Sequence, residues 1–119
     1  MAYVAKHRFA GISTRKARLV LELVRGRRLE DAIHLCAHSP KRAAVLVGKV
    51  LKSAQANARE RGEEAVSALV ITKAYADEGP SRRKWSPRAR GGASPILKRT
   101  SHIVIELDTA AEGVPGQEA

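Results

Sequence analysis

Residues 79–101 read GPSRRKWSPRARGGASPILKRTS. This segment contains seven basic residues and no carboxylate, so it cannot neutralise its own charge. Its three prolines and three glycines exclude a helix and a central strand, because proline lacks an amide donor and glycine weakens strand order. Apolar, β-branched runs flank it at residues 66–75 and 102–107. This arrangement predicts one long hairpin, whose base lies in a sheet and whose arm, residues 79–101, projects from it.

The positive charge of the chain is concentrated in this arm. The 119 residues include 22 Lys and Arg against 12 Asp and Glu, a formal net charge of +10. Residues 79–105 contain seven of these basic residues and no acidic one. Such a distribution is typical of proteins that bind nucleic acids or other polyanions. The length favours one domain, residues 1–108 including the arm, followed by a flexible tail at residues 109–119.

The residues before the hairpin are expected to form one strand and three helices. Residues 2–10 predict an edge strand with Tyr3, Ala5 and Phe9 on one face. Ser13 then supplies an N-cap for a helix that Gly26 closes. The apolar residues of this helix recur at helical spacing: Ala17, Val20, Leu21 and Val24.

Two further helices follow. The second is expected from about Leu29 to His38, because its apolar residues keep the same spacing. Ser39 and Pro40 predict the start of the third, with serine as N-cap and proline at the first helical position, and Gly62 is expected to end it. Its apolar stripe consists of Ala43, Leu46, Val47, Val50, Leu51, Ala54 and Ala58.

The two strands of the hairpin base have different patterns. In the first strand, from residue 66, Leu69, Ile71 and Tyr75 are expected on one face. In the return strand, alternation places the apolar residues Ile103, Ile105 and Leu107 on one side.

No residue cluster predicts an enzyme, a metal site or a cofactor. His34 and His38 lie four residues apart on a helix, but no third ligand follows at a familiar spacing. Cys36 falls on an apolar stripe, where an inert buried thiol is the usual occupant. The carboxylate pairs at residues 63–64 and 77–78 lack an apolar pocket that would raise a pKa. As the single cysteine, Cys36 also excludes an internal disulfide.

The cellular setting is expected to be cytoplasmic. The N-terminal residues contain no apolar region typical of a secretory signal, and no apolar run approaches the ~20 residues that span a bilayer. A membrane-spanning protein is therefore not expected.

The arginines of the arm favour phosphate groups, so that an RNA would be recognised by its shape. Arginine binds two phosphate oxygens at once through its planar guanidinium, and most such contacts are independent of sequence. Arg15, Lys16 and Arg18 add positive charge at the start of the first helix, where the helix dipole disfavours it. Trp85 either stacks on a base or anchors the hairpin against its own proline and arginine side chains.

Several motifs of the chain are specific enough to suggest a family. In the hairpin they are Asp77-Glu78-Gly79-Pro80, Pro87-Arg88-Ala89-Arg90-Gly91 and Lys98-Arg99-Thr100-Ser101-His102-Ile103. Upstream they are Arg15-Lys16-Ala17-Arg18-Leu19-Val20, Val24-Arg25-Gly26, Lys49-Val50-Leu51-Lys52-Ser53-Ala54 and Asn57-Ala58. Together they resemble the universal large-subunit ribosomal protein family called L-twenty-two, in its bacterial or organellar form. The resemblance covers about residues 3–107, in the same order.

This resemblance implies an α+β fold of order βαααββ, with three helices packed on a small three-stranded sheet and a long protruding basic hairpin. It also implies a structural protein of the large ribosomal subunit, in the cytoplasm or an organelle, which binds rRNA and supports subunit assembly. The expected partners are large-subunit rRNA, neighbouring ribosomal proteins at the exit tunnel and the nascent polypeptide. A homo-oligomer is not expected.

The expected rRNA-binding residues combine the basic helix start with the arm. They are Arg15, Lys16, Arg18, Arg82, Arg83, Lys84, Trp85, Arg88, Arg90, Lys98, Arg99, Thr100, Ser101 and His102. The resemblance further implies a hairpin tip that lines the exit tunnel. This tip consists of Pro87, Arg88, Ala89, Arg90, Gly91, Gly92 and Ala93. A free-standing RNA chaperone or regulatory RNA binder remains the alternative, and an enzyme is a distant third.

Overall fold

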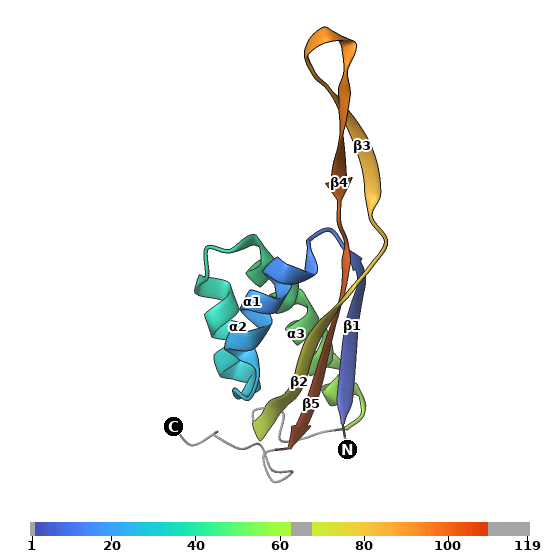
Figure 1. The fold of residues 1–119 in the computed structure, drawn as a ribbon. Helices are drawn as coiled ribbons and strands as arrows, with labels where there is room; N and C mark the ends of the chain where they lie inside the picture. The colour runs from blue at the N-terminus through green and yellow to red at the C-terminus, as the bar shows by residue number, and fades with distance from the viewer. Residues whose placement is uncertain (1, 63–67, 110–119) are drawn as a thin grey trace.

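The computed structural model describes residues 2–62 and 68–109. Three helices and five main strands follow one another in the order β1, α1, α2, α3, β2, β3, β4, β5 (Figure 1). The α+β class expected from the sequence is therefore confirmed. The sheet beside the helices has the three strands that were expected, and the arm forms two further strands in a separate sheet.

The main sheet contains three antiparallel strands in the order β1-β5-β2. Its strands are β1 (Tyr3–Ala10), β2 (Leu69–Glu78) and β5 (Ser101–Thr109). The last strand of the chain thus lies at the centre, and β1 occupies one edge, as predicted. Ile103, Ile105 and Leu107 of β5 are all fully buried, which confirms that they share the inner face.

The helices cover one face of this sheet (Figure 1). They are α1 (Thr14–Val24), α2 (Leu29–His38) and α3 (Arg42–Glu60). The predicted stripe of α1 is entirely buried, and that of α3 is buried except for Leu46, which is partly covered. Apolar residues at helical spacing therefore identify the side of each helix that packs on the sheet.

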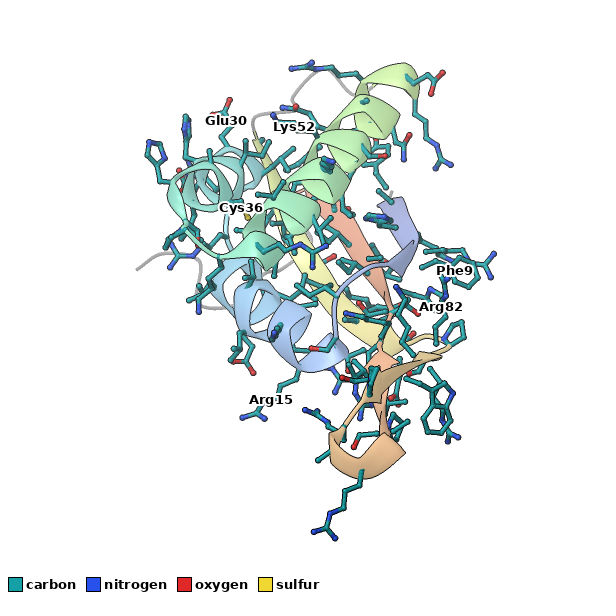
Figure 2. The ribbon with its side chains drawn as sticks, turned by 90° about the horizontal axis from the view of Figure 1, so that it is seen from above. Phe9, Arg15, Glu30, Cys36, Lys52 and Arg82 are labelled. Carbon is teal, nitrogen blue, oxygen red and sulfur yellow. The ribbon has the colours of Figure 1, made fainter. Side chains whose placement is uncertain are left out.

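Two predictions about strand faces are wrong, and both fail at irregularities in the sheet. Phe9 does not share the buried face of Tyr3 and Ala5, because the register of β1 shifts between His7 and Ala10. Phe9 takes a left-handed φ of 58° there and is 56% exposed (Figure 2). Tyr75 is likewise exposed, because a register shift between Ile71 and Lys73 moves the inner face of β2 onto Ala74 and Ala76.

The predicted start of α3 is also wrong by two residues. Lys41 is its N-cap and Arg42 its first residue, so Pro40 lies before the helix. Ser39 instead follows α2 as its C-cap, and its hydroxyl accepts a hydrogen bond from the amide of Lys41 at 3.3 Å. The serine therefore stabilises the turn between two helices.

The outer edge of β2 is covered by the end of α1 and the residues that follow it. The Arg18 guanidinium donates two hydrogen bonds to the carbonyl of Ala76, one of them at 2.9 Å. Arg25 binds the carbonyl of Ala74 in the same bidentate way. Backbone hydrogen bonds of 3.0 Å join Gly26 and Arg27 to Ile71. Side chains and backbone of the connection thus satisfy the edge that no strand covers.

The arm is a two-stranded antiparallel ribbon beyond the main sheet (Figure 1). Its strands are β3 (Arg82–Pro87) and β4 (Ala93–Lys98). A turn at Ala89–Gly91 joins them, with hydrogen bonds from the Arg88 amide to the Gly92 carbonyl and from the Gly92 amide to the Ala89 carbonyl. With the arm, the molecule measures 63 × 28 × 21 Å along its principal axes.

No helix in residues 2–62 and 68–109 is long and apolar enough to cross a membrane. The predicted flexible tail lies outside the described residues except for Thr109, which ends β5. The carboxylate pair at residues 63–64 also lies outside them.

Candidate nucleic-acid interface

The basic side chains of the arm point into solvent. Arg82, Arg83 and Lys84 of β3 are exposed, as are Lys98 of β4 and Arg99 after it. Among these five, only Arg99 has an ion-pair partner within the described residues, the carboxylate of Glu78 at 3.4 Å. The other cations are therefore available to an external anion.

The tip presents two more free cations, Arg88 and Arg90. Arg90 has a left-handed φ of 59° and the following Gly91 a φ of 73°. Two successive residues with positive φ reverse the chain tightly, and glycine adopts this conformation without steric cost. Neither arginine side chain has a hydrogen bond or ion pair with any described residue, so the turn displays both.

Trp85 is 62% exposed on β3 and lies opposite Pro95 of β4. A side chain that anchored the hairpin by burial would lose most of its exposed surface, which Trp85 does not. Its ring is therefore accessible for stacking.

The root of the arm is held by polar contacts that use several of the predicted site residues. The Thr100 hydroxyl donates to the carbonyl of Pro80 at 2.6 Å, and the Gly79 amide donates to the carbonyl of Thr100 at 3.0 Å. A side chain at Gly79 would bring its Cβ to 2.6 Å from the Thr100 hydroxyl oxygen. The close crossing of the two strands thus requires glycine at this position.

Ser101 and His102 also face the protein. Ser101 is fully buried, so its hydroxyl cannot reach an external phosphate in this conformation. The Nδ1 atom of His102 accepts a hydrogen bond of 3.0 Å from the amide of Phe9. The two rings meet edge to face with centroids 4.9 Å apart, which fixes the bulge of β1 against the arm root.

The predicted basic residues of α1 divide into two groups. Arg15 and Lys16 are exposed and have no hydrogen bond or ion pair within the described part of the chain. Arg18 instead binds the carbonyl of Ala76. The positive charge of Arg18 remains at the surface, but two of its three guanidinium nitrogens donate to the sheet edge.

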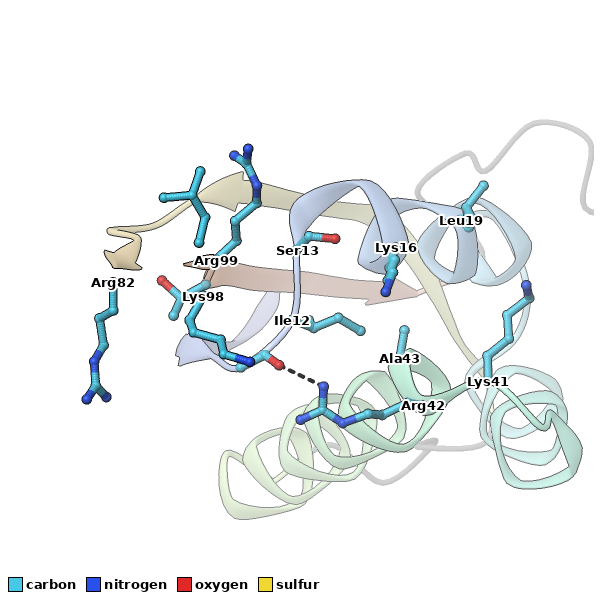
Figure 3. A pocket seen from close by; sticks show the side chains of 13 residues that line it. Ile12, Ser13, Lys16, Leu19, Lys41, Arg42, Ala43, Arg82, Lys98 and Arg99 are labelled. Carbon is cyan, nitrogen blue, oxygen red and sulfur yellow. Dashed lines mark hydrogen bonds between the residues drawn. The ribbon is translucent and has the colours of Figure 1, made fainter. Parts of the chain in front are cut away.

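A groove lies where the body meets the arm, and we call it the root groove (Figure 3). The starts of α1 and α3 line it together with the arm root, and its volume is about 1000 Å³. No carboxylate lines it. Its basic residues are Lys16, Lys41, Arg42, Arg82, Lys98 and Arg99.

Lys41 and Arg42 were not among the residues expected at the interface. Arg42 donates a hydrogen bond of 2.8 Å to the carbonyl of Gly11, which joins the start of α3 to the β1–α1 connection (Figure 3). The only sequence signal was the basic pair directly before the apolar stripe of α3. Because both residues lie far from the arm in the sequence, the sequence did not indicate that they line the same groove as the arm root.

Among the described residues, the two histidines and the cysteine that were weighed as metal-binding or catalytic do not converge on one site. The Nδ1 atom of His38 lies 2.8 Å from the His34 carbonyl oxygen in the same helix. No group of three His, Cys, Asp or Glu within residues 2–62 and 68–109 is arranged to hold a metal ion. Cys36 is buried between α2 and α3, and burial raises the pKa of its thiol (Figure 2). It therefore lacks the thiolate character of a nucleophile.

A model of the family described as ribosomal protein L22p/L17e matches residues 5–108, which include the whole arm and all three helices. The match agrees with the basic arm, the exposed cations and the resemblance found in the sequence motifs. The chain therefore belongs to the ribosomal protein L22p/L17e family and, as that family implies, is an rRNA-binding structural protein of the large ribosomal subunit.

Proposed function

We propose that the arm makes the main rRNA contact of this protein and that its tip, residues 87–93, lines the nascent-peptide exit tunnel. The observation that carries this proposal is the arm's set of exposed cations without internal partners. A two-stranded ribbon has little core of its own, so its positive charge requires an external polyanion for neutralisation.

The shape of the molecule supports the same division of roles. The helices and the main sheet contain the buried residues, whereas no residue of β3 or β4 is buried. The compact βαααββ body acts as an anchor on the surface of the subunit, and the protruding hairpin extends from it into folded RNA. During assembly, rRNA that folds around the arm neutralises it, which couples binding to subunit maturation.

The individual residues contribute in different ways. Arg82, Arg83, Lys84 and Lys98 bind phosphates along the ribbon, and Arg15 and Lys16 extend this surface onto α1. Arg99 exchanges its ion pair with Glu78 for a phosphate, and Trp85 stacks on an exposed base. Thr100, Ser101 and His102 hold the root of the arm instead of contacting RNA.

At the tip, Arg88 and Arg90 contact rRNA or face the nascent polypeptide. Neighbouring ribosomal proteins complete the tunnel wall beside them. In this arrangement the protein acts as a single copy per subunit and performs no catalysis.

Site-directed photo-crosslinking in assembled ribosomes tests the proposed orientation. A benzophenone amino acid replaces Ala89 at the tip in one variant and Ala56 on α3 in a matched control, and both positions are exposed. We expect a stalled nascent chain to crosslink to position 89 and not to position 56, because only the tip reaches the tunnel. Crosslinking of the nascent chain from position 56 alone would show that the orientation is wrong.

A further inference from the structure

The root groove contains both basic and apolar surface. A patch that binds only phosphate needs the basic surface alone. Its rim contains cations from three elements that lie far apart in the sequence. Its walls contain exposed leucine side chains, Leu19 of α1 and Leu97 of β4. The floor between α1 and α3 is formed by Ile12 and Ala43, which are 5% and 3% exposed (Figure 3).

The cations of the groove differ in how freely they can bind an anion. One guanidinium nitrogen of Arg42 donates a hydrogen bond to the Gly11 carbonyl, and the Arg99 guanidinium forms an ion pair with Glu78. The side chains of Lys16, Lys41, Arg82 and Lys98 have no hydrogen-bonding or ionic partner in the described ranges. Free cations therefore border the groove on the α1 side, the α3 side and the arm side.

Two leucines add exposed apolar surface to the groove. Leu19 is 51% exposed and Leu97 is 46% exposed. Exposed apolar surface inside a basic cavity weakens simple phosphate binding, because it offers no hydrogen bond. It favours a ligand with an apolar, planar part next to its negative charge.

We propose that the root groove binds a short unpaired RNA segment, with bases against Leu19 and Leu97 and phosphates on the surrounding lysines and arginines. This inference rests on the proposed rRNA contact of the arm and identifies the kind of RNA that meets its root. Bases that leave the stack are bound in proteins by apolar, aromatic or arginine surfaces. The Arg82 and Arg99 guanidinium planes supply such surfaces in a groove without aromatic residues.

The size of the groove favours a short unpaired RNA segment over double-stranded RNA as its ligand. A volume of about 1000 Å³ is at the upper end for a small-molecule site and admits a few nucleotides, but not a double helix. An acidic peptide is the other polyanion of suitable size. RNA is favoured over such a peptide, because the basic surface of the arm continues into the groove. Arg82 and Lys98 are cross-strand neighbours in the arm and also line the groove. One RNA strand along the arm therefore leads directly into it.

Binding of the full chain to two RNA probes tests this inference. One probe is a fully paired RNA duplex of two strands, and the other is the same duplex with a short internal loop that carries a fluorescent base analogue. We expect tighter binding of the looped probe and a change in fluorescence, because the analogue leaves water for the leucine surface. The double variant Leu19→Ala/Leu97→Ala should lose about fivefold in affinity for the looped probe and little for the paired one.

The matched control is Leu23→Ala/Ile96→Ala. These residues are 44% and 38% exposed, lie on the same two elements and do not line the groove. The control should retain the wild-type preference for the looped probe. All four side chains are exposed, so both variants should fold, which circular dichroism checks.

Three results would overturn the inference. They are equal wild-type affinity for the two probes, equal loss in the two double variants, and tighter binding of a polyglutamate peptide that depends on Leu19 and Leu97. If the wild-type chain still binds large-subunit rRNA in these cases, only the groove inference is wrong. Failure to bind large-subunit rRNA at all would instead remove the proposed function as well.

Discussion

Removal of four arm arginines should flatten the salt dependence of rRNA binding. The variant replaces Arg82, Arg83, Arg88 and Arg90 with alanine. Each of these side chains is exposed, and none has a hydrogen bond or ion pair with another described residue. Each one that meets a phosphate in the complex releases counterions on binding, so its loss reduces the slope of log K against log salt by about 0.7–0.9. If all four meet phosphates, the slope falls by about 3.

The assay is fluorescence anisotropy of a labelled large-subunit rRNA fragment, titrated with the full chain over a series of salt concentrations. A first control replaces the same four arginines with lysine, which keeps the charge and should keep most of the slope. A second control removes the same formal charge from α3 and the residue after it. It replaces Lys49, Lys52, Arg59 and Arg61 with alanine.

The comparison between the two alanine variants decides the result. If the arm is the main contact, the arm variant loses far more slope than the α3 variant, although both lose four charges. Equal losses would indicate general attraction by net charge. An unchanged slope in the arm variant, together with a reduced slope in the α3 variant, would refute the arm as the RNA-binding element.

Three predictions concern the body. Ser101→Ala should raise the free energy of unfolding by up to about 1 kcal/mol, because the buried hydroxyl has no hydrogen-bond partner among the described residues. Thermal denaturation measures this change, and a clear loss of stability would contradict the prediction. Arg18→Ala should lower the same free energy by about 1 kcal/mol, because the Ala76 carbonyl loses a bidentate charged donor; Arg15→Ala, without that contact, is the control. Iodoacetamide should alkylate Cys36 much more slowly in the native protein than in urea at the same pH, because burial raises the pKa of the thiol and shields it. Equal rates would show that the thiol is accessible.

The helices were the most predictable part of the fold. Val20, Leu21 and Val24 recur at helical spacing in α1, and the structure buries all three completely. The predicted limits of α2 also agree with the structure. Where a single face contacts the core, the period of the apolar residues is sufficient to identify it.

The irregularity of β1 could not be predicted, because the residue that contacts it lies far away in the chain. The left-handed φ of Phe9 accompanies a hydrogen bond to His102, which is 93 residues away. Alternation assumes a regular strand, so one inserted residue reverses every later assignment. Tyr75 was assigned to the wrong face for this reason.

Only part of the candidate interface could be predicted from the sequence. Charge density located the arm, because seven basic residues without a carboxylate are visible in the sequence alone. It did not separate the unpaired cations from Arg18, whose guanidinium binds a backbone carbonyl. The root groove was not predicted, because Lys41, Arg42 and Lys98 meet only through tertiary packing.

The two arginines on the outer edge of β2 affect the tendency of the chain to aggregate before it binds RNA. A bare edge strand is a template on which other chains can add strands and aggregate. Arg18 and Arg25 occupy the carbonyl oxygens of Ala76 and Ala74 that such a strand would use. Their charge also repels other copies of a chain with a net charge of +10. A newly synthesised ribosomal protein thus contains its own protection against aggregation while it waits for its RNA.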